Sequence, residues 1–217
     1  MDPQEESTIA NGETLTDVSI NVSQNMLPIQ FPLCEGLEDT SLGTTFQYSV
    51  RAGEFGQIIH TGQCHWVAVS NIACRKGEVN VYDSLNYGTL TTYTVKQIAT
   101  ILHEEDPEII LNIKPVQQQN NSTDCGVFAI AFVASLLNGQ DPSTASYNNN
   151  QLSTHLLWCI KHGHLSPFPQ ASGQTRLKRC KGKRAITELF CSCRMPWDKQ
   201  DGKRRATLIA CCDKCEE

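Results

Sequence analysis

The sequence predicts an α+β domain, in which a twisted sheet packs against one central buried helix. Two observations lead to this class. Short apolar runs, each bounded by Gly, Asn or a charged residue, occur at 56–62, 65–72 and 78–84, and such runs are typical of strands. The segment 125–139 (CGVFAIAFVASLLNG) is apolar on nearly every face, so as a helix it belongs inside the domain.

The remaining elements have recognisable ends. Thr94 and Gln97 have the spacing of a capping box, which predicts a helix of about twelve residues beginning there. A further strand is expected at 108–116. The segment 151–163 has helical apolar spacing, and Gly163 suits the C-terminal end of such a helix.

Charge divides the 217-residue chain, whose formal net charge is −5, into unlike parts. Residues 1–25 are rich in Ser, Thr, Asn and acidic residues without a sustained apolar period, so we expect a disordered acidic tail before a domain at 26–166. No run approaches the roughly 18 apolar residues of a membrane span, and the first thirty residues lack the features of a signal peptide. We therefore expect an intracellular protein, nuclear or cytoplasmic, with no membrane partner.

Cys125 is the candidate nucleophile. It lies where a polar loop meets the start of the buried helix, directly after Asp124, a candidate N-cap. A thiol at a helix N-terminus meets the positive end of the helix dipole, which with a nearby imidazolium lowers a cysteine pKa from about 8.5 to between about 3.5 and 7.5. Gly126 is expected to leave room for a substrate backbone, and the Cys125 N–H to face a developing oxyanion.

Three further residues complete a predicted catalytic set. His65 begins a strand and is the best placed of the six histidines to exchange a proton with the thiol. Asp83 ends the next strand, so antiparallel pairing of the two strands would bring it close enough to orient His65. Gln119, six residues before Cys125, is expected to supply a second oxyanion donor through its side-chain amide.

The motifs HWV, YDS and QNNSTDCGVFA, in this order, resemble the ubiquitin-like protease family, the SUMO-protease-like cysteine peptidases. The resemblance covers about residues 30–165 and implies a papain-like cysteine peptidase core that needs no cofactor for catalysis. It also implies these roles: His65 as general base and acid, Asp83 as its orienter, Gln119 as oxyanion donor, Cys125 as nucleophile, and Trp66 as a wall of the channel for the substrate's diglycine tail.

We therefore expect a peptidase or isopeptidase that cleaves after the diglycine tail of a ubiquitin-like modifier, its partner in the cell. The alternative is a catalytically weak chromatin-associated binding module, derived from a mobile element. About forty residues separate the predicted tail from His65, whereas such peptidases usually carry a longer chain before this histidine. The short chain favours the alternative. The presence of all four catalytic residue types favours the enzyme.

The C-terminal part is expected to hold a basic linker, 167–187, and the opening half of a PHD-type zinc finger, 188–217. Three interpretations of the linker stay open: a nuclear localisation patch, a segment that touches nucleic acid, and a merely solvated segment. The finger resemblance implies a chromatin or histone-tail partner and two pairs of zinc-binding thiolates: Cys191 with Cys193, and Cys212 with Cys215. Two outcomes remain open, a single Cys₄ zinc site and, as the favoured one, a tail that does not fold without metal.

Overall fold

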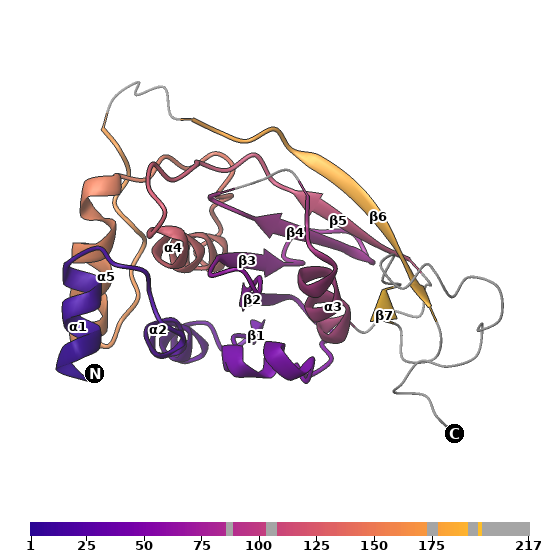
Figure 1. Ribbon diagram of the computed structural model, residues 1–217, viewed down its shortest axis with the longest axis horizontal. Coiled ribbons are helices and arrows are strands. Elements are labelled where there is room, and N and C mark those ends of the chain that lie inside the picture. The colour runs from indigo at the N-terminus through magenta and orange to yellow at the C-terminus, as the bar shows by residue number, and fades with distance from the viewer. Residues whose placement is uncertain (86–88, 103–107, 173–177, 191–194, 197–217) are drawn as a thin grey trace.

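The computed structural model describes residues 1–85, 89–102, 108–172, 178–190 and 195–196. Its centre is a mixed sheet whose strands follow one another in chain order (Figure 1). β1 pairs with β2 and β4 with β5 in parallel, and the other pairs are antiparallel. The strands are β1 (Glu35–Gly36), β2 (Phe55–His60), β3 (Trp66–Ser70), β4 (Glu78–Tyr82), β5 (Glu108–Ile113), β6 (Lys183–Phe190) and β7 (Met195–Pro196).

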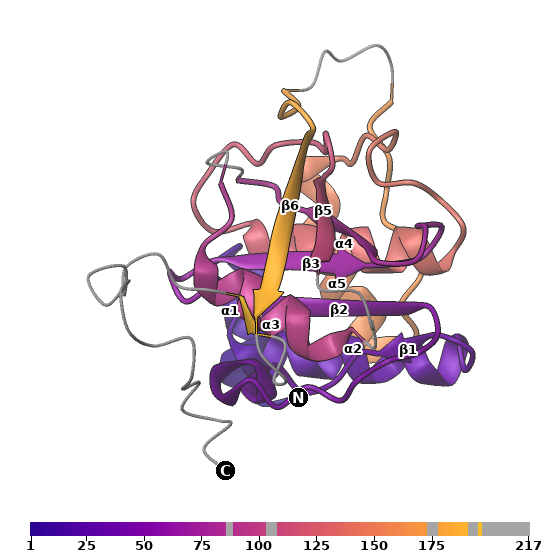
Figure 2. The same cartoon turned by 90° about the vertical axis from the view of Figure 1, so that its right-hand side faces the viewer.

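Helices cover both faces of the sheet. α3 lies on one face, which Figure 2 presents, and α4 packs on the opposite face against β2 and β3. The α-helices are α1 (Pro3–Ala10), α2 (Asp17–Gln30), α3 (Thr92–Ile101), α4 (Cys125–Leu137) and α5 (Leu152–His162). Short 3₁₀ turns occur at Thr40–Thr45 and Asn149–Gln151. This arrangement agrees with the α+β class that the sequence predicts.

The two-residue period of β3 divides the core in two. Trp66 and Ala68 point into the cluster around α4, whereas Val67 and Val69 point into the cluster beneath α3. All four side chains are buried, since a strand covered on both faces exposes neither. The residues that begin β3 are therefore held firmly on both sides.

The expectation of a disordered tail at 1–25 is wrong. The Asp2 carboxylate caps α1, and the Thr16 hydroxyl caps α2 by accepting the Ser19 N–H. Ile9 and Ile20 are fully buried in the cluster around α4. These apolar residues are too widely spaced to indicate a core by themselves, and α4 and α5 supply the surface that buries them. The folded domain therefore begins at α1 and not at residue 26.

The predicted linker at 167–187 is also partly folded. Phe168 is buried, and the Arg179 guanidinium donates to the carbonyls of Pro115 and Ala145. β6 begins at Lys183 and pairs with β5 along its length. Backbone hydrogen bonds hold this strand, and they do not require the apolar side chains by which strands are recognised in a sequence. The sheet therefore extends beyond the expected domain boundary at 166.

The predicted start of α3 is displaced. Thr91, not Thr94, is the N-cap, and its hydroxyl accepts the Thr94 N–H at 3.1 Å. Gln97 does not reach back to the cap, because its amide donates to the His60 carbonyl at 2.8 Å.

None of the helices in the described ranges combines the length and hydrophobicity needed to cross a bilayer.

Candidate active site

The pairing of β3 with β4 brings His65 to Asp83. Ala68 and Tyr82 are paired in the antiparallel register, so the residue before β3 and the residue after β4 meet at the same end of the sheet. Nε2 of His65 lies 2.7 Å from Oδ1 of Asp83. Both residues are less than a tenth exposed, which strengthens a hydrogen bond between them. The geometry expected from the strand pattern is therefore present.

Cys125 meets the imidazole from the opposite side of the site. It is the first residue of α4 and is 1% exposed. Its thiol is close enough to His65 to raise the pKa of the imidazole. Because Nε2 of His65 is engaged by Asp83, the ring nitrogen left for Cys125 is Nδ1. Asp83, His65 and Cys125 thus lie in series.

The charge state of His65 follows from these partners. Burial lowers the pKa of His65, but its hydrogen bond to the Asp83 carboxylate, the nearby Cys125 and the negative charge of Asp83 outweigh burial and raise the pKa to about 9. The site therefore favours an imidazolium at neutral pH.

Gln119 is held by both ends of its side-chain amide. Oε1 accepts the hydroxyl of Ser84 at 2.6 Å, and Nε2 donates to the Asn121 carbonyl at 2.8 Å. The backbone N–H of Gln119 also donates to the carbonyl of Ser84, the residue after Asp83. Gln119 is only 5% exposed. The structure thus brings Gln119 to the same strand end as the His65–Asp83 pair.

The start of α4 is capped differently from expectation. Asp124 occupies the N-cap position, but its carboxylate makes no capping hydrogen bond. Asn121 instead fixes the turn before the helix, since its Oδ1 accepts the N–H groups of Thr123 and Asp124 at 3.1 and 3.0 Å. Burial raises the pKa of Asp124, and a hydrogen bond from Asn121 partly opposes this.

Leu15, in the turn between α1 and α2, is a site neighbour that sequence reasoning missed. Its carbonyl accepts the indole N–H of Trp66 at 3.0 Å. A Cβ built on Gly126 would lie 2.9 Å from the Cβ of Leu15, so Leu15 occupies the space that we expected to be open for a substrate backbone. The pair Thr16–Asp17, a typical helix start, was the available signal that this segment folds.

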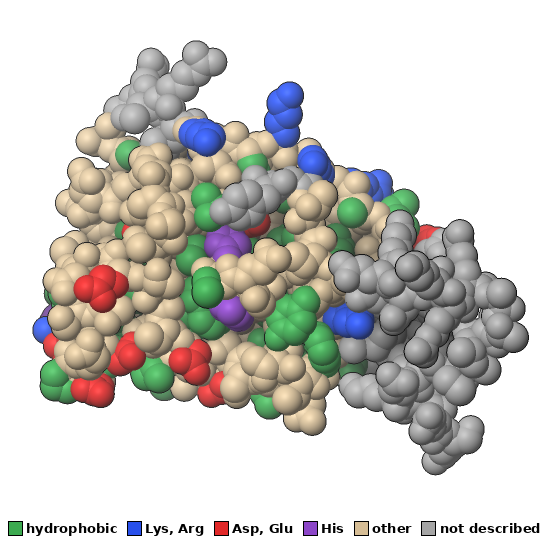
Figure 3. Space-filling model, viewed as in Figure 1, with side chains coloured by type: hydrophobic (Ala, Val, Ile, Leu, Met, Phe, Trp, Pro, Cys, Tyr) green, Lys and Arg blue, Asp and Glu red, His purple; other side chains and the backbone are tan. Residues whose placement is uncertain are grey.

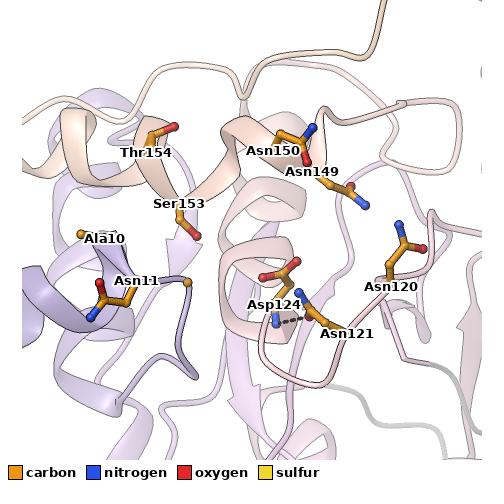
Figure 4. A pocket seen from close by; sticks show the side chains of 10 residues that line it. Ala10, Asn11, Asn120, Asn121, Asp124, Asn149, Asn150, Ser153 and Thr154 are labelled. Carbon is orange, nitrogen blue, oxygen red and sulfur yellow. Dashed lines mark hydrogen bonds between the residues drawn. The ribbon is translucent and has the colours of Figure 1, made fainter.

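A polar cavity of about 410 Å³ opens beside the N-terminus of α4 (Figure 4). Asn120, Asn121 and Asp124 line one side, the end of α1 lines another, and the third is lined by Asn149, Asn150, Ser153 and Thr154. Amide and hydroxyl groups dominate this lining and are suited to hydrogen-bond a peptide backbone.

Elsewhere, Figure 3 shows histidine surface flanked by hydrophobic surface in the middle of the face that Figure 1 presents.

The predicted zinc ligands Cys191, Cys193, Cys212 and Cys215 lie outside the described residues. Within the described part of the chain, no group of three or more His, Cys, Asp or Glu side chains is arranged to hold a metal ion. The zinc site therefore stays a prediction.

Residues 57–153 match the model of the Ulp1 protease family, C-terminal catalytic domain. The matched segment contains all four residues of the predicted catalytic set. This segment is similar to the catalytic domain of Ulp1-family proteases. The predicted class of cysteine-type peptidase, a hydrolase, is thereby confirmed, whereas no comparison supports a PHD finger.

Solved structures agree on the fold of this domain. The C-terminal Ulp1 protease domain in complex with Smt3, the yeast ortholog of SUMO, is 15% identical with a TM-score of 0.56, covering 74% of this chain and 82% of that one. SUMO protease Ulp1 with its catalytic cysteine oxidized to a sulfinic acid is 15% identical with a TM-score of 0.58, covering 75% and 83%. At such identities the likeness establishes the fold alone. No curated protein matches the sequence.

Proposed function

We propose that this domain hydrolyses the bond that follows the diglycine tail of a SUMO-type ubiquitin-like modifier. The observation that carries the proposal is the buried series Asp83–His65–Cys125, within a segment that matches the Ulp1 family. The choice of modifier is supported by the Ulp1 domain, which shares this fold and whose solved complex contains a SUMO ortholog. In such a reaction the leaving group is a lysine amine or a peptide.

The first half of the reaction uses the charged pair. The Cys125 thiolate attacks the carbonyl carbon of the terminal glycine, and the new C–S bond places negative charge on the carbonyl oxygen. The Cys125 N–H and the second Nε2 hydrogen of Gln119 stabilise this oxyanion. As the C–N bond breaks, His65 transfers the Nδ1 proton to the departing amine, leaving a thioester.

The second half regenerates the enzyme. Neutral His65 takes a proton from a water molecule, and the resulting hydroxide oxygen attacks the thioester carbonyl. The C–S bond breaks, which releases the modifier with a free carboxylate and restores the Cys125 thiolate. Throughout, Asp83 accepts the Nε2–H bond and so keeps Nδ1 directed at the sulfur and the substrate.

Trp66 is proposed to form one wall of the channel that admits the diglycine tail, as the family resemblance implies. Its indole is held by the carbonyl of Leu15 and lies edge-on to His60, with ring centroids 4.7 Å apart. Because the indole is fixed in this way, Trp66 cannot move aside to widen the channel. Glycine residues, which lack side chains, suit such a channel.

The test is labelling with vinyl sulfone probes made from SUMO and from ubiquitin. The wild-type protein is expected to form a covalent adduct with the SUMO probe, and Cys125→Ala is expected to form none. Cys159→Ala serves as the matched control, since it removes another fully buried thiol, on α5. Adduct formation that persists in Cys125→Ala, or moves to the exposed Cys64 beside His65, would contradict the assignment of the nucleophile.

The alternative of a catalytically weak binding module is not favoured, because two hydrogen-bonded pairs of polar side chains, His65–Asp83 and Ser84–Gln119, remain buried at one strand end. The chromatin partner and the nuclear or cytoplasmic location stay proposals. For the C-terminal thiols we propose at most one Cys₄ zinc site. Its test is the zinc content of the purified chain, which should fall in Cys212→Ser if the site exists and be absent in both proteins if it does not.

A further inference from the structure

We propose that Ser84 is a positioning residue for the oxyanion donor: its hydroxyl holds the Gln119 amide so that an Nε2–H bond is directed at the reacting carbonyl. This inference rests on the proposed function, because Gln119 needs an oxyanion to bind. Ser84 itself touches no reacting atom. It acts through Gln119, whose Oε1 lies 2.6 Å from the Ser84 hydroxyl oxygen.

Both partners are withdrawn from solvent. Ser84 is 1% exposed and Gln119 is 5% exposed. In such surroundings water does not replace a lost hydroxyl easily, and an unpaired carbonyl oxygen is costly. The backbone contact from the Gln119 N–H to the Ser84 carbonyl at 2.8 Å fixes the separation of the two residues independently of their side chains. The hydroxyl therefore serves the orientation of the amide rather than the attachment of the loop.

The two amide ends have partners of different kinds. The Asn121 backbone carbonyl is only an acceptor, so the end of the Gln119 amide that faces it must be Nε2. The Ser84 hydroxyl then donates to Oε1, since a rotated amide would oppose two carbonyl oxygens. Asn121 uses one Nε2 hydrogen. The second has no acceptor among the described residues and is the one assigned to the oxyanion.

Ser84 also has a favourable position along the chain. Asp83, directly before it, orients His65, while Ser84 orients Gln119. Two consecutive residues at the end of β4 thus align the proton carrier with the oxyanion donor. A hydroxyl that donates to an amide oxygen also polarises that amide, which makes its N–H groups better donors. Both effects are greatest when charge develops on the substrate, so they belong to the rate of the chemical step.

The experiment is a kinetic double-mutant cycle with a SUMO–aminomethylcoumarin substrate. The proteins are wild type, Ser84→Ala, Gln119→Ala and the double variant. We expect Ser84→Ala to lower kcat about tenfold with KM unchanged, the effect of one lost buried hydrogen bond. In the Gln119→Ala background the same substitution should change kcat less than twofold, because no amide remains to be positioned.

Ser135→Ala is the matched control. It removes another fully buried hydroxyl, one bonded to the Tyr147 hydroxyl at 2.8 Å near the far end of α4. We expect it to lower Tm without changing kcat. If Ser84→Ala does not fold, Ser84→Cys replaces it, because a thiol is a similar but weaker donor. An unchanged kcat in a folded Ser84→Cys protein would overturn the proposal.

The outcomes separate this inference from the proposed function. If Gln119→Ala lowers kcat less than threefold, the oxyanion role of Gln119 is wrong and the role of Ser84 falls with it. In a second outcome, Gln119→Ala lowers kcat strongly, and Ser84→Ala lowers kcat by the same factor in the Gln119→Ala background as in wild type. The proposed function then stands and the Ser84 inference fails. NMR titration of His65 should give the same pKa in Ser84→Ala as in wild type. A lowered value would show that Ser84 acts through Asp83 instead.

Discussion

Leu15 packs against Gly126 so closely that the glycine has no room for a side chain, with 2.9 Å between the Leu15 Cβ and a Cβ built at position 126. The same residue accepts the indole N–H of Trp66. One backbone turn near the N-terminus therefore contacts both the residue after Cys125 and the residue after His65. The first thirty residues are thus part of the framework of the active site.

We expect Gly126→Ala to destabilise the protein by about 1–3 kcal/mol, the usual effect of overpacking, and to slow probe labelling of Cys125. The methyl group must displace Leu15 or tilt the start of α4. Urea denaturation and labelling rates measure the two effects. Gly56→Ala is the matched control, because a Cβ there meets its nearest neighbour, Val133, at 3.5 Å, an ordinary contact. Equal stability of the two variants would contradict the packing described.

Ile20→Ala tests whether the N-terminal segment folds as part of the domain. Ile20 is fully buried on α2, so the truncation should cost about 2–5 kcal/mol in the free energy of unfolding. Val18, two residues earlier on the same helix, is 48% exposed, and Val18→Ala should change stability by less than about 0.5 kcal/mol. A disordered tail would make both substitutions neutral.

The His65–Asp83 pair was predictable because its determinants are local. His65 and Asp83 flank two short strands joined by a short connection, and the antiparallel register follows from that connection. Cys125 was predictable because α4 is apolar on every side, which marks its position at the centre of the domain. In both cases, neighbouring residues in the sequence carry the information.

The missed features depend on distant partners. Ile9, Leu15 and Ile20 become a core only when α4 and α5 lie beneath them, and no window around any one of them shows this. β6 begins with Lys183 and Arg184, which continue the basic run before it, and joins the sheet through the backbone of β5, so its start resembles a solvated linker in the sequence. Ser84 is likewise inconspicuous until Gln119 folds back onto it.

The raised pKa of His65 predicts a specific dependence of stability on pH. Because the folded-state pKa of about 9 exceeds the ordinary value near 6.5, protonated His65 stabilises the fold fully below about pH 6.5, and this contribution is lost as pH rises through about 9. Asp83→Asn removes a charge that raises the pKa. The stability difference between wild type and Asp83→Asn should therefore narrow with rising pH in urea denaturation, and a constant difference would exclude the charged pair.

Asp83→Asn should also lower the rate far more than it lowers stability. An asparagine Nδ2 facing His65 would favour the ring tautomer with the proton on Nδ1, so that neutral His65 could no longer accept a proton there. We expect kcat to fall by about 10²- to 10⁴-fold, because a misassigned tautomer affects every turnover. Asp141→Asn is the matched control, since the Asp141 carboxylate accepts the Ser143 N–H at 2.8 Å and pairs with Lys114 at 3.9 Å, and its substitution is expected to leave kcat unchanged. If Asp83→Asn retained more than a tenth of the wild-type kcat, Asp83 would not be the residue that orients the imidazole.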